Sequence, residues 1–220
     1  MKRLSIYIFV SLALGIGFMG STANAAGYKF ITKWGSLGTN QSEFDSPFRA
    51  AIDLRGNIYV TDVNNNRIQK FTSNGKFITS WGSSGTNTGE FIFPAGIAVD
   101  LAGNVYVADE GNDRIQKFTS FGAFITSWGS LGSEDGKFNG PYDVAIDLAG
   151  NVYVADSSND RIQKFTSNGR FITKFGLRGS EDGQLYYPNG VAVSLLGKTV
   201  YVVDTLNNRV QKFRHSLFVK

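Results

Sequence analysis

A segment of 47 residues recurs four times in this chain, and the copies begin at Trp34, Trp81, Trp128 and Phe175. Each copy holds a Gly-rich loop, a proline, a short apolar run, a turn, an aromatic run and an Asn-x-Arg corner. The segments Asn104–Thr119 and Asn151–Thr166 differ at only two positions. Self-similarity at a fixed period of this size indicates a repeat architecture.

Each copy contains four runs with the character of β-strands, and none has helical periodicity. In the second copy, Gly96–Asp100 is a short apolar run and Asn104–Ala108 is rich in β-branched and aromatic residues. Arg114–Thr119 alternates polar and apolar residues, and Ala123–Trp128 follows after a turn. We therefore predict an all-β fold of four-stranded antiparallel units.

Four antiparallel strands per repeat is the pattern of a β-propeller blade. A blade leaves two apolar faces uncovered, so neighbouring blades must stack. Tyr28–Trp34 matches only the fourth strand of a blade, and the last copy departs from the pattern after Phe213. We predict that this N-terminal strand is a latch that completes the last blade and closes a four-bladed ring. The alternative is that chains associate to complete a larger ring.

The repeated segments, such as Asn57–Phe71 and Val200–Phe213, resemble the NHL repeat. Its hallmark is a G-N-[IV]-Y-V-x-D-x-x-[NH]-x-R-[IV] core followed by an aromatic–Gly loop and a proline. The resemblance covers essentially all of residues 26–220. It implies a β-propeller, although NHL propellers usually have six blades, and members of the family include enzymes, receptors and scaffolds.

The N-terminus has the composition of a secretory signal peptide. Lys2 and Arg3 precede the apolar run Leu4–Met19, and Ala23-Asn24-Ala25 is an A-x-A cleavage site. The apolar run is shorter than the roughly 20 residues of a spanning helix. We therefore predict a signal peptide at residues 1–25, a propeller domain at residues 26–220, no membrane span after cleavage, and a secreted or cell-envelope location.

Composition argues against several classes of function. There are no cysteines and one histidine, His215, so thiolate chemistry and His-dependent catalysis lack their residues. Without residues 1–25 the chain keeps 20 basic and 18 acidic residues. Such a balance does not indicate a nucleic-acid partner.

Two charged features recur in every copy and are therefore expected to be structural. An Asp precedes an Arg by five residues at each corner, as in Asp109 and Arg114, and we expect a bidentate ion pair that fixes the loop. A lysine also recurs once per blade, and we expect the four to form a solvated positive ring on outer strands (Lys70, Lys117, Lys164 and Lys212).

The copies differ on one face. Antiparallel strands bring the loop before the first strand and the corner after the second strand to the same side. There the sequence varies while the strands stay nearly constant, as expected when a fixed scaffold carries a recognition surface. The candidate ligand-binding residues are Phe48, Arg49, Glu110, Tyr142, Asp143 and Asn189.

The favoured functional hypothesis is an extracytoplasmic, non-enzymatic scaffold that binds a protein, peptide or glycan on this face without a cofactor. The alternative is a metal-dependent lyase or lactonase-like hydrolase, in which Asp143, Asn189 and Glu110 would hold one axial calcium or magnesium ion. A third hypothesis is a structural component that assembles through blade edges.

Overall fold

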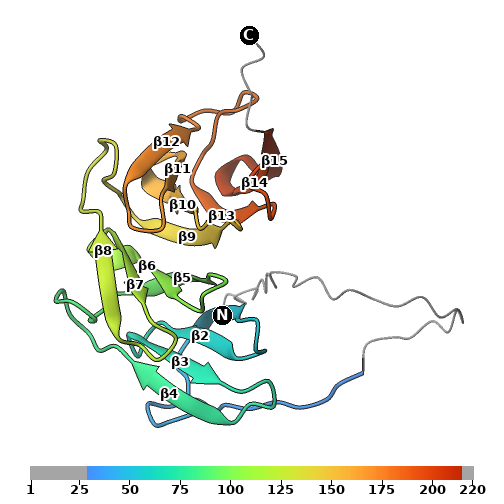
Figure 1. Cartoon of the computed structure of the whole chain (residues 1–220). Coiled ribbons are helices and arrows are strands. Elements are labelled where there is room, and N and C mark those ends of the chain that lie inside the picture. The colour runs from blue at the N-terminus through green and yellow to red at the C-terminus, as the bar shows by residue number, and fades with distance from the viewer. Residues whose placement is uncertain (1–28, 215–220) are drawn as a thin grey trace, which may run out of the picture.

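The computed structural model describes residues 29–214, and the fold within that range is all-β. The predicted signal peptide and His215 lie outside the described residues. Four antiparallel sheets follow one another around a common centre, from blue-green through green and yellow to red (Figure 1). No helix in the described range is long and apolar enough to cross a membrane.

The sheets repeat one strand order. The first contains β1 (Pro47–Ile52), β2 (Ile58–Asp62), β3 (Arg67–Phe71) and β4 (Phe77–Trp81). The second contains β5 (Pro94–Val99), β6 (Val105–Asp109), β7 (Arg114–Phe118) and β8 (Phe124–Trp128). The third contains β9 (Pro141–Ile146), β10 (Val152–Asp156), β11 (Arg161–Phe165) and β12 (Phe171–Phe175). The fourth contains β13 (Pro188–Val193), β14 (Thr199–Asp204) and β15 (Arg209–Arg214).

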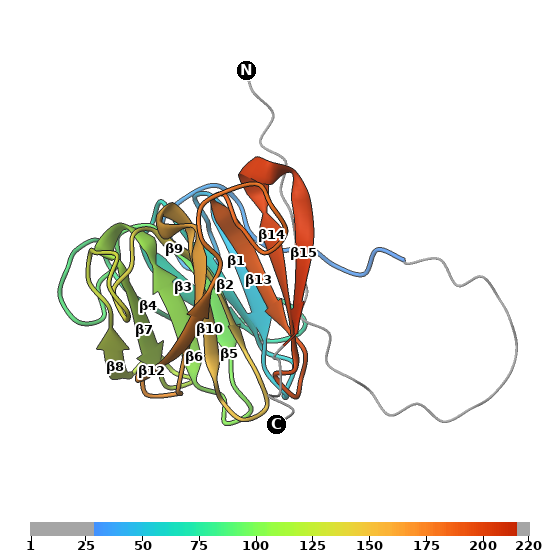
Figure 2. The ribbon, with the colours of Figure 1, turned by 90° about the horizontal axis from the view of Figure 1, so that it is seen from above.

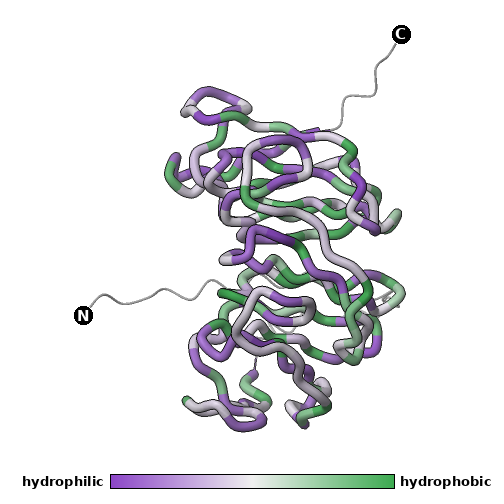
Figure 3. The backbone as a smooth tube through the Cα atoms, turned by 90° about the vertical axis from the view of Figure 1, so that its left-hand side faces the viewer, coloured by the Kyte–Doolittle hydropathy of each residue, from purple (hydrophilic) through white to green (hydrophobic). Residues whose placement is uncertain are grey.

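Short 3-10 turns form three of the corners between the second and third strands, where the sequence predicted no helix. They are η1 (Glu110–Asn112), η2 (Ser157–Asn159) and η3 (Thr205–Asn207). Each ends in a residue with a left-handed backbone, which lets the chain reverse into the next strand. Hydrophobic and hydrophilic stretches are interspersed along the chain (Figure 3), and β6 and β10 are buried along their whole length because their sheets are packed on both faces.

The core is divided into three clusters, each between two consecutive sheets. We call the face of a sheet that meets the next sheet its trailing face, and the opposite face its leading face. Between the first two sheets, Tyr59 and Ile68 of the trailing face pack on Val105, Val107 and Phe118 of the leading face. The same positions fill the second and third clusters. The interface between blades is thus one structure made three times.

The two outermost faces of the series lack this cover. On the trailing face of the fourth sheet, Tyr201 is 44% exposed and Val210 is 65% exposed, whereas the equivalent Tyr106 and Ile115 are fully buried. On the leading face of the first sheet, Ala50 is exposed, whereas its equivalent Ile97 is buried. The described residues therefore contain two end faces that no sheet covers.

The predicted latch does not form. The fourth sheet has three strands, and residues 29–34 are not part of any strand. This blue segment extends away from the sheets in two perpendicular views (Figures 1 and 2). Only Trp34 stays at the first sheet, where its ring lies 5.9 Å from that of Phe71. The β-propeller prediction is confirmed, but residues 29–34 form no strand beside β15, and Trp34 of this segment contacts the first sheet, at the other end of the series.

The prediction of a solvated lysine ring is also wrong for two of its members. Lys70 and Lys117 are buried between blades, at 3% and 6% exposed. Lys70 Nζ donates a hydrogen bond to the Ser120 carbonyl at 2.9 Å and lies 4.9 Å from the centre of the Tyr59 ring. Desolvation by this burial lowers the pKa of Lys70. The lysine stem fills space while the ammonium reaches a carbonyl of the next blade.

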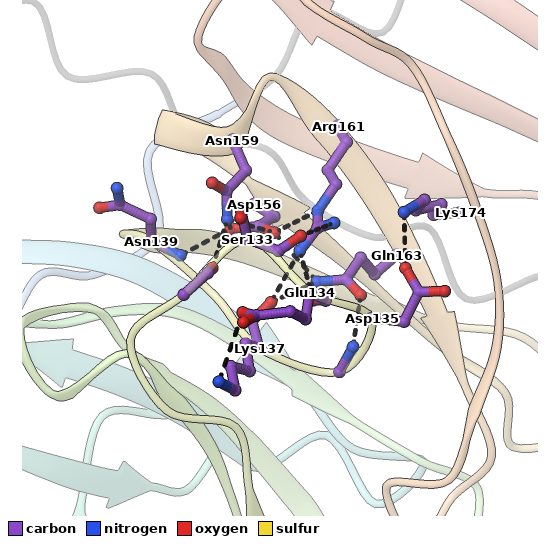
Figure 4. Close-up of polar contacts among 12 residues, drawn as sticks. Ser133, Glu134, Asp135, Lys137, Asn139, Asp156, Asn159, Arg161, Gln163 and Lys174 are labelled. Carbon is purple, nitrogen blue, oxygen red and sulfur yellow. Dashed lines mark hydrogen bonds and ion pairs between the residues drawn. The ribbon is translucent and has the colours of Figure 1, made fainter.

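A buried polar cluster fixes each corner, and Figure 4 shows the one in the third sheet. Asp156 Oδ2 accepts a 2.6 Å hydrogen bond from Arg161 Nε and a 2.9 Å bond from Gln163 Nε2. The other guanidinium nitrogens of Arg161 donate to the carbonyls of Ser133, Glu134 and Lys137. The predicted bidentate pair is therefore a single bond to the carboxylate, and the guanidinium ties the preceding loop to the corner instead.

Candidate functional site

The loops that vary between copies meet on one face, as the antiparallel order predicts. In the second sheet, Glu110 N–H donates to the Phe93 carbonyl at 3.3 Å, and in the third, Ser157 N–H donates to the Gly140 carbonyl at 3.3 Å. In the fourth, Leu206 N–H donates to the Tyr186 carbonyl at 3.0 Å. Each blade thus presents its corner and the loop before its first strand as one joined unit. We call that loop the entry loop.

Neighbouring units are joined in turn by side chains at the left-handed corner positions. Asp113 Oδ1 accepts a 2.8 Å hydrogen bond from Gly140 N–H, and Asp160 Oδ1 accepts a 2.7 Å bond from Tyr187 N–H. Asn66 Oδ1 does the same for Phe93 N–H at 3.1 Å. The variable face is therefore a continuous, rigidly tied surface across the blades.

Three of the candidate residues converge from three different innermost strands. Arg49 of β1 places Nε 3.9 Å from Asp143 Oδ1 of β9, and both side chains are nearly buried. Arg49 Nη2 also donates to the Asn189 carbonyl of β13 at 3.4 Å. Asp143 Oδ2 accepts a 3.0 Å hydrogen bond from Val191 N–H. This polar cluster joins the first sheet to the third and fourth at the centre of the molecule.

Burial changes the acidity of the carboxyl group in this cluster. Desolvation raises the pKa of Asp143 to about 6, although the Arg49 charge and the bonds from Val191 and Val144 N–H oppose it. The Asp143 side chain is 15% exposed, so the carboxyl is largely withdrawn from water. It is neutral at mildly acidic pH and ionised above pH 6.

An aromatic group lies beside the polar cluster. The Phe48 ring meets the Tyr142 ring edge-on at 5.4 Å, and it lies 6.5 Å from the Phe93 ring. The Arg49 guanidinium lies 4.8 Å from the centre of the Phe48 ring. Phe93 is 39% exposed, so part of this aromatic surface faces water. Together Phe48, Phe93 and Tyr142 form what we call the aromatic cluster.

Glu110 is an acidic group of this face that forms no ion pair with any residue between 29 and 214. Its Oε2 atom is buried and makes no hydrogen bond within residues 29–214. Desolvation, with a smaller contribution from Asp113, raises the pKa of Glu110 to about 7. Its carboxylate in turn contributes, after burial, to raising the pKa of Tyr142. Glu110 lines an open cavity of about 290 Å³ between the second and third sheets with Phe93, Gly111, Asp113, Asn139, Gly140 and Ser158.

The structure brings the six candidate residues together on one face. Phe48, Arg49, Tyr142, Asp143 and Asn189 are joined by the contacts given above, and Glu110 lies near enough for its charge to act on Tyr142. Sequence reasoning missed Phe93, which has a left-handed backbone at φ 55°. Its position directly before Pro94 in a variable loop was the available signal.

The set proposed for an axial ion has other partners in the structure. Asp143 faces the Arg49 guanidinium, and the Asn189 carbonyl accepts a bond from the same group. Over residues 29–214 no three His, Cys, Asp or Glu side chains lie close enough to hold a metal ion. The axial ion of the enzyme hypothesis stays a prediction.

Family models match this sequence over most of the propeller. Residues 138–165 and 185–213 match the NHL repeat, and residues 49–127 match a model described as a 6-bladed beta-propeller. The chain belongs to the NHL-repeat β-propeller family. No curated protein matches this NHL propeller in sequence.

Solved structures share its fold at low identity. A streptogramin B lyase is 19% identical with a TM-score of 0.53, and the match covers 76% of this chain and 54% of that one. Virginiamycin B lyase from Staphylococcus aureus is 17% identical with a TM-score of 0.53, covering 76% and 55%. Kuenenia stuttgartiensis hydrazine synthase is 16% identical with a TM-score of 0.60, covering 80% and 48%. The NHL propeller spans about half the length of these chains, and the likeness establishes the fold alone.

Proposed function

We propose that this NHL propeller is a non-enzymatic binding scaffold, which holds a protein, peptide or glycan ligand on the face formed by its variable loops. The predicted signal peptide would place this activity outside the cytoplasm. The observation that carries the proposal is Glu110, a desolvated carboxyl group with an unpartnered oxygen at an open cavity beside exposed aromatic surface.

The chemistry of this surface favours a peptide or protein segment with a basic side chain. A buried acceptor without a partner costs free energy, which a ligand ammonium or guanidinium would recover. The aromatic cluster would hold the apolar stem of such a side chain and attract its cation. The loops are tied to one another, so the surface needs little ordering when it binds.

Fluorescence anisotropy with labelled hexapeptides tests this proposal. Lys- or Arg-containing peptides are expected to bind at pH 8 and to bind several-fold more weakly at pH 5.5, since Glu110 loses its charge below its pKa of about 7. Peptides with Gln in place of the basic residue should bind weakly at both pH values. Selection of uncharged glycans instead would reassign the ligand class.

Matched variants locate the site. Glu110→Gln should weaken the binding of the basic peptides by about tenfold, as expected for the loss of a charge-assisted hydrogen bond. Glu134→Gln removes an exposed glutamate that pairs with Lys137 and should leave binding unchanged. Equal affinity of wild type and Glu110→Gln for every basic peptide would contradict the proposal.

A further inference from the structure

The two end faces described above are the two halves of an interface that this chain already makes three times. The trailing face of the fourth sheet offers Tyr201, Val203 and Val210 at the positions that Tyr106, Ala108 and Ile115 occupy in the second core cluster. The leading face of the first sheet offers Ala50, Ile58 and Val60, which correspond to the buried Val144, Val152 and Val154 of that cluster. The end faces are therefore complementary in kind.

The two end faces also carry the residues that form hydrogen bonds between neighbouring blades elsewhere in the chain. Lys117 Nζ donates to the Ser167 carbonyl of the next blade at 3.1 Å. Lys212 and Ser73 are the corresponding donor and acceptor residues, and they lie at opposite ends of the series. Asn208 has the left-handed backbone of Asp113 and Asp160, whose carboxylates accept bonds from the next entry loop. The residue that corresponds to these donors and would match Asn208 is Ser46, which ends the loop before β1 at the other end of the series.

A third unfinished feature is the outer edge of the fourth sheet. In the other sheets a fourth strand pairs with the third, for example Lys117 with Thr126. Within residues 29–214, β15 has no such neighbour, and a hollow of about 590 Å³ lies along Arg209–Phe213 with Asp182 and Gly183. Residues 29–34 have the sequence of a fourth strand, yet they are unpaired, with Phe30 73% and Ile31 82% exposed.

The position of Trp34 connects these observations. Trp128 ends the fourth strand of the second sheet and packs against Gly169 of the third. Trp34 packs in the same way against Gly75 of the first sheet, so residues 29–34 lie where the outer strand of a preceding blade would end. Any sheet that packs on the leading face of the first sheet would therefore meet this segment at its own outer edge.

We infer that a second copy of this chain packs head to tail on the first. Its leading end face covers Tyr201 and Val210, and its residues 29–34 add the missing fourth strand to β15. Such contacts join different surfaces of the two copies. If the rotation between neighbouring copies closes after two, they form a closed dimer, and otherwise further copies add head to tail. Adding a strand satisfies the open backbone groups of β15, and packing buries both end faces.

A negative charge introduced on each end face tests the pairing. Val210→Glu and Ala50→Glu lie at exposed positions, so both variants are expected to fold, with circular dichroism as the check. By analytical ultracentrifugation the wild-type protein is expected to be a dimer or larger, and each variant a monomer. Leu101→Glu, at an exposed turn on neither end face, should associate as the wild type does. A monomeric wild-type protein at 50 µM would overturn the inference.

Mixing the two variants separates head-to-tail contact from a symmetric one. Val210→Glu keeps a sound leading face and Ala50→Glu keeps a sound trailing face, so the mixture is expected to give a one-to-one heterodimer. A dimer that joins two trailing faces would survive Ala50→Glu, so that variant would dimerise with itself and no heterodimer with Val210→Glu would form. That result would overturn the head-to-tail arrangement.

Cysteine pairs test the exchanged strand, since the chain has no cysteine of its own. Lys70 pairs with Thr79 and Lys117 with Thr126, so the equivalent Lys212 should lie opposite Thr32 of the second copy. A chain with Thr32→Cys and Lys212→Cys should oxidise to an intermolecular disulfide on a non-reducing gel. Lys33→Cys with Lys212→Cys is the control, because neighbouring strand residues point to opposite faces. A cross-linked monomer, or equal cross-linking of the control, would overturn the exchange.

Discussion

At the scale of single residues, this propeller separates buried charges that hold the loops from one that has no partner. Asp156 has a cation and several hydrogen bonds around it, and yet burial raises its pKa. Glu110 has no ion pair with any described residue, and burial raises its pKa to about 7. The first arrangement recurs in every blade, while the second occurs once among the described corners, which is why only the second is part of the candidate site.

Removing a corner carboxylate should be costly. Asp156→Ala leaves a buried guanidinium without its anion and is expected to lower the free energy of unfolding by about 3–5 kcal/mol. The control is Lys174→Ala, which removes an exposed 2.6 Å ion pair with Asp135 and should cost about 0–1 kcal/mol. Urea unfolding followed by circular dichroism measures both, and similar costs would mean that the corner is not held by Asp156.

Stability should depend on pH through Glu110. Its pKa rises from 4.5 to about 7 on folding, so between these values the unfolded state loses the proton while the folded state keeps it. The contribution of Glu110 to the free energy of unfolding is therefore fully present below pH 4.5 and is lost as pH rises toward 7. The Glu110→Gln variant should lack this component, so its Tm advantage over wild type should be larger at pH 8 than at pH 5. A constant difference in Tm would contradict the assignment.

At the scale of elements, turns couple one blade to the next. Gly169, in the turn between β11 and β12, has φ 83°, and a Cβ there would lie 2.6 Å from the Trp128 ring of the preceding blade. The hairpin thus needs glycine both for its own backbone and for the approach of the neighbouring tryptophan. This coupling is repeated at Gly75 and Gly122.

Two alanine variants separate these requirements. Gly169→Ala should destabilise the protein by about 1–3 kcal/mol more than Gly136→Ala, because only the first forces a ring out of place. Gly136 has a nearly identical φ of 85°, but open space surrounds its Cβ position. Thermal unfolding of both variants gives the difference, and equal losses would mean that Trp128 moves freely.

Much of this local structure could be predicted from sequence. The strands expected at Asn104–Ala108 and Arg114–Thr119 match β6 and β7 within a residue, because a fourfold repeat states the same pattern several times. The burial of Lys70 could not be predicted. The alternating pattern of its strand indicates an exposed lysine, and nothing in the local sequence shows that the Ser120 carbonyl of the next blade lies within reach of its ammonium group. The convergence of Arg49, Asp143 and Asn189 depends on how strands far apart in sequence meet, which spacing alone does not contain.

At the scale of the whole molecule, and among the residues that the structure describes, the two inner sheets are covered on both faces and the first and fourth sheets on one. Stability in a repeat structure is approximately the sum of unit and neighbour terms, so the ends should open first. In the Val210→Glu variant, where association is blocked, amides of β15 are expected to exchange hydrogen faster than those of β7 and β11. Hydrogen–deuterium exchange with mass spectrometry tests this, and protection of β15 equal to that of β11 would contradict it.

Because the three interfaces between blades are alike, the chain can change length in evolution by gaining or losing whole repeats. A gene segment that encodes one repeat can be duplicated or lost by recombination between its near-identical neighbours. Because each blade presents the same pair of surfaces, an added blade would find both of its contacts already matched. We expect natural relatives to differ in length by whole repeats, whereas insertions of other sizes should be confined to the variable loops.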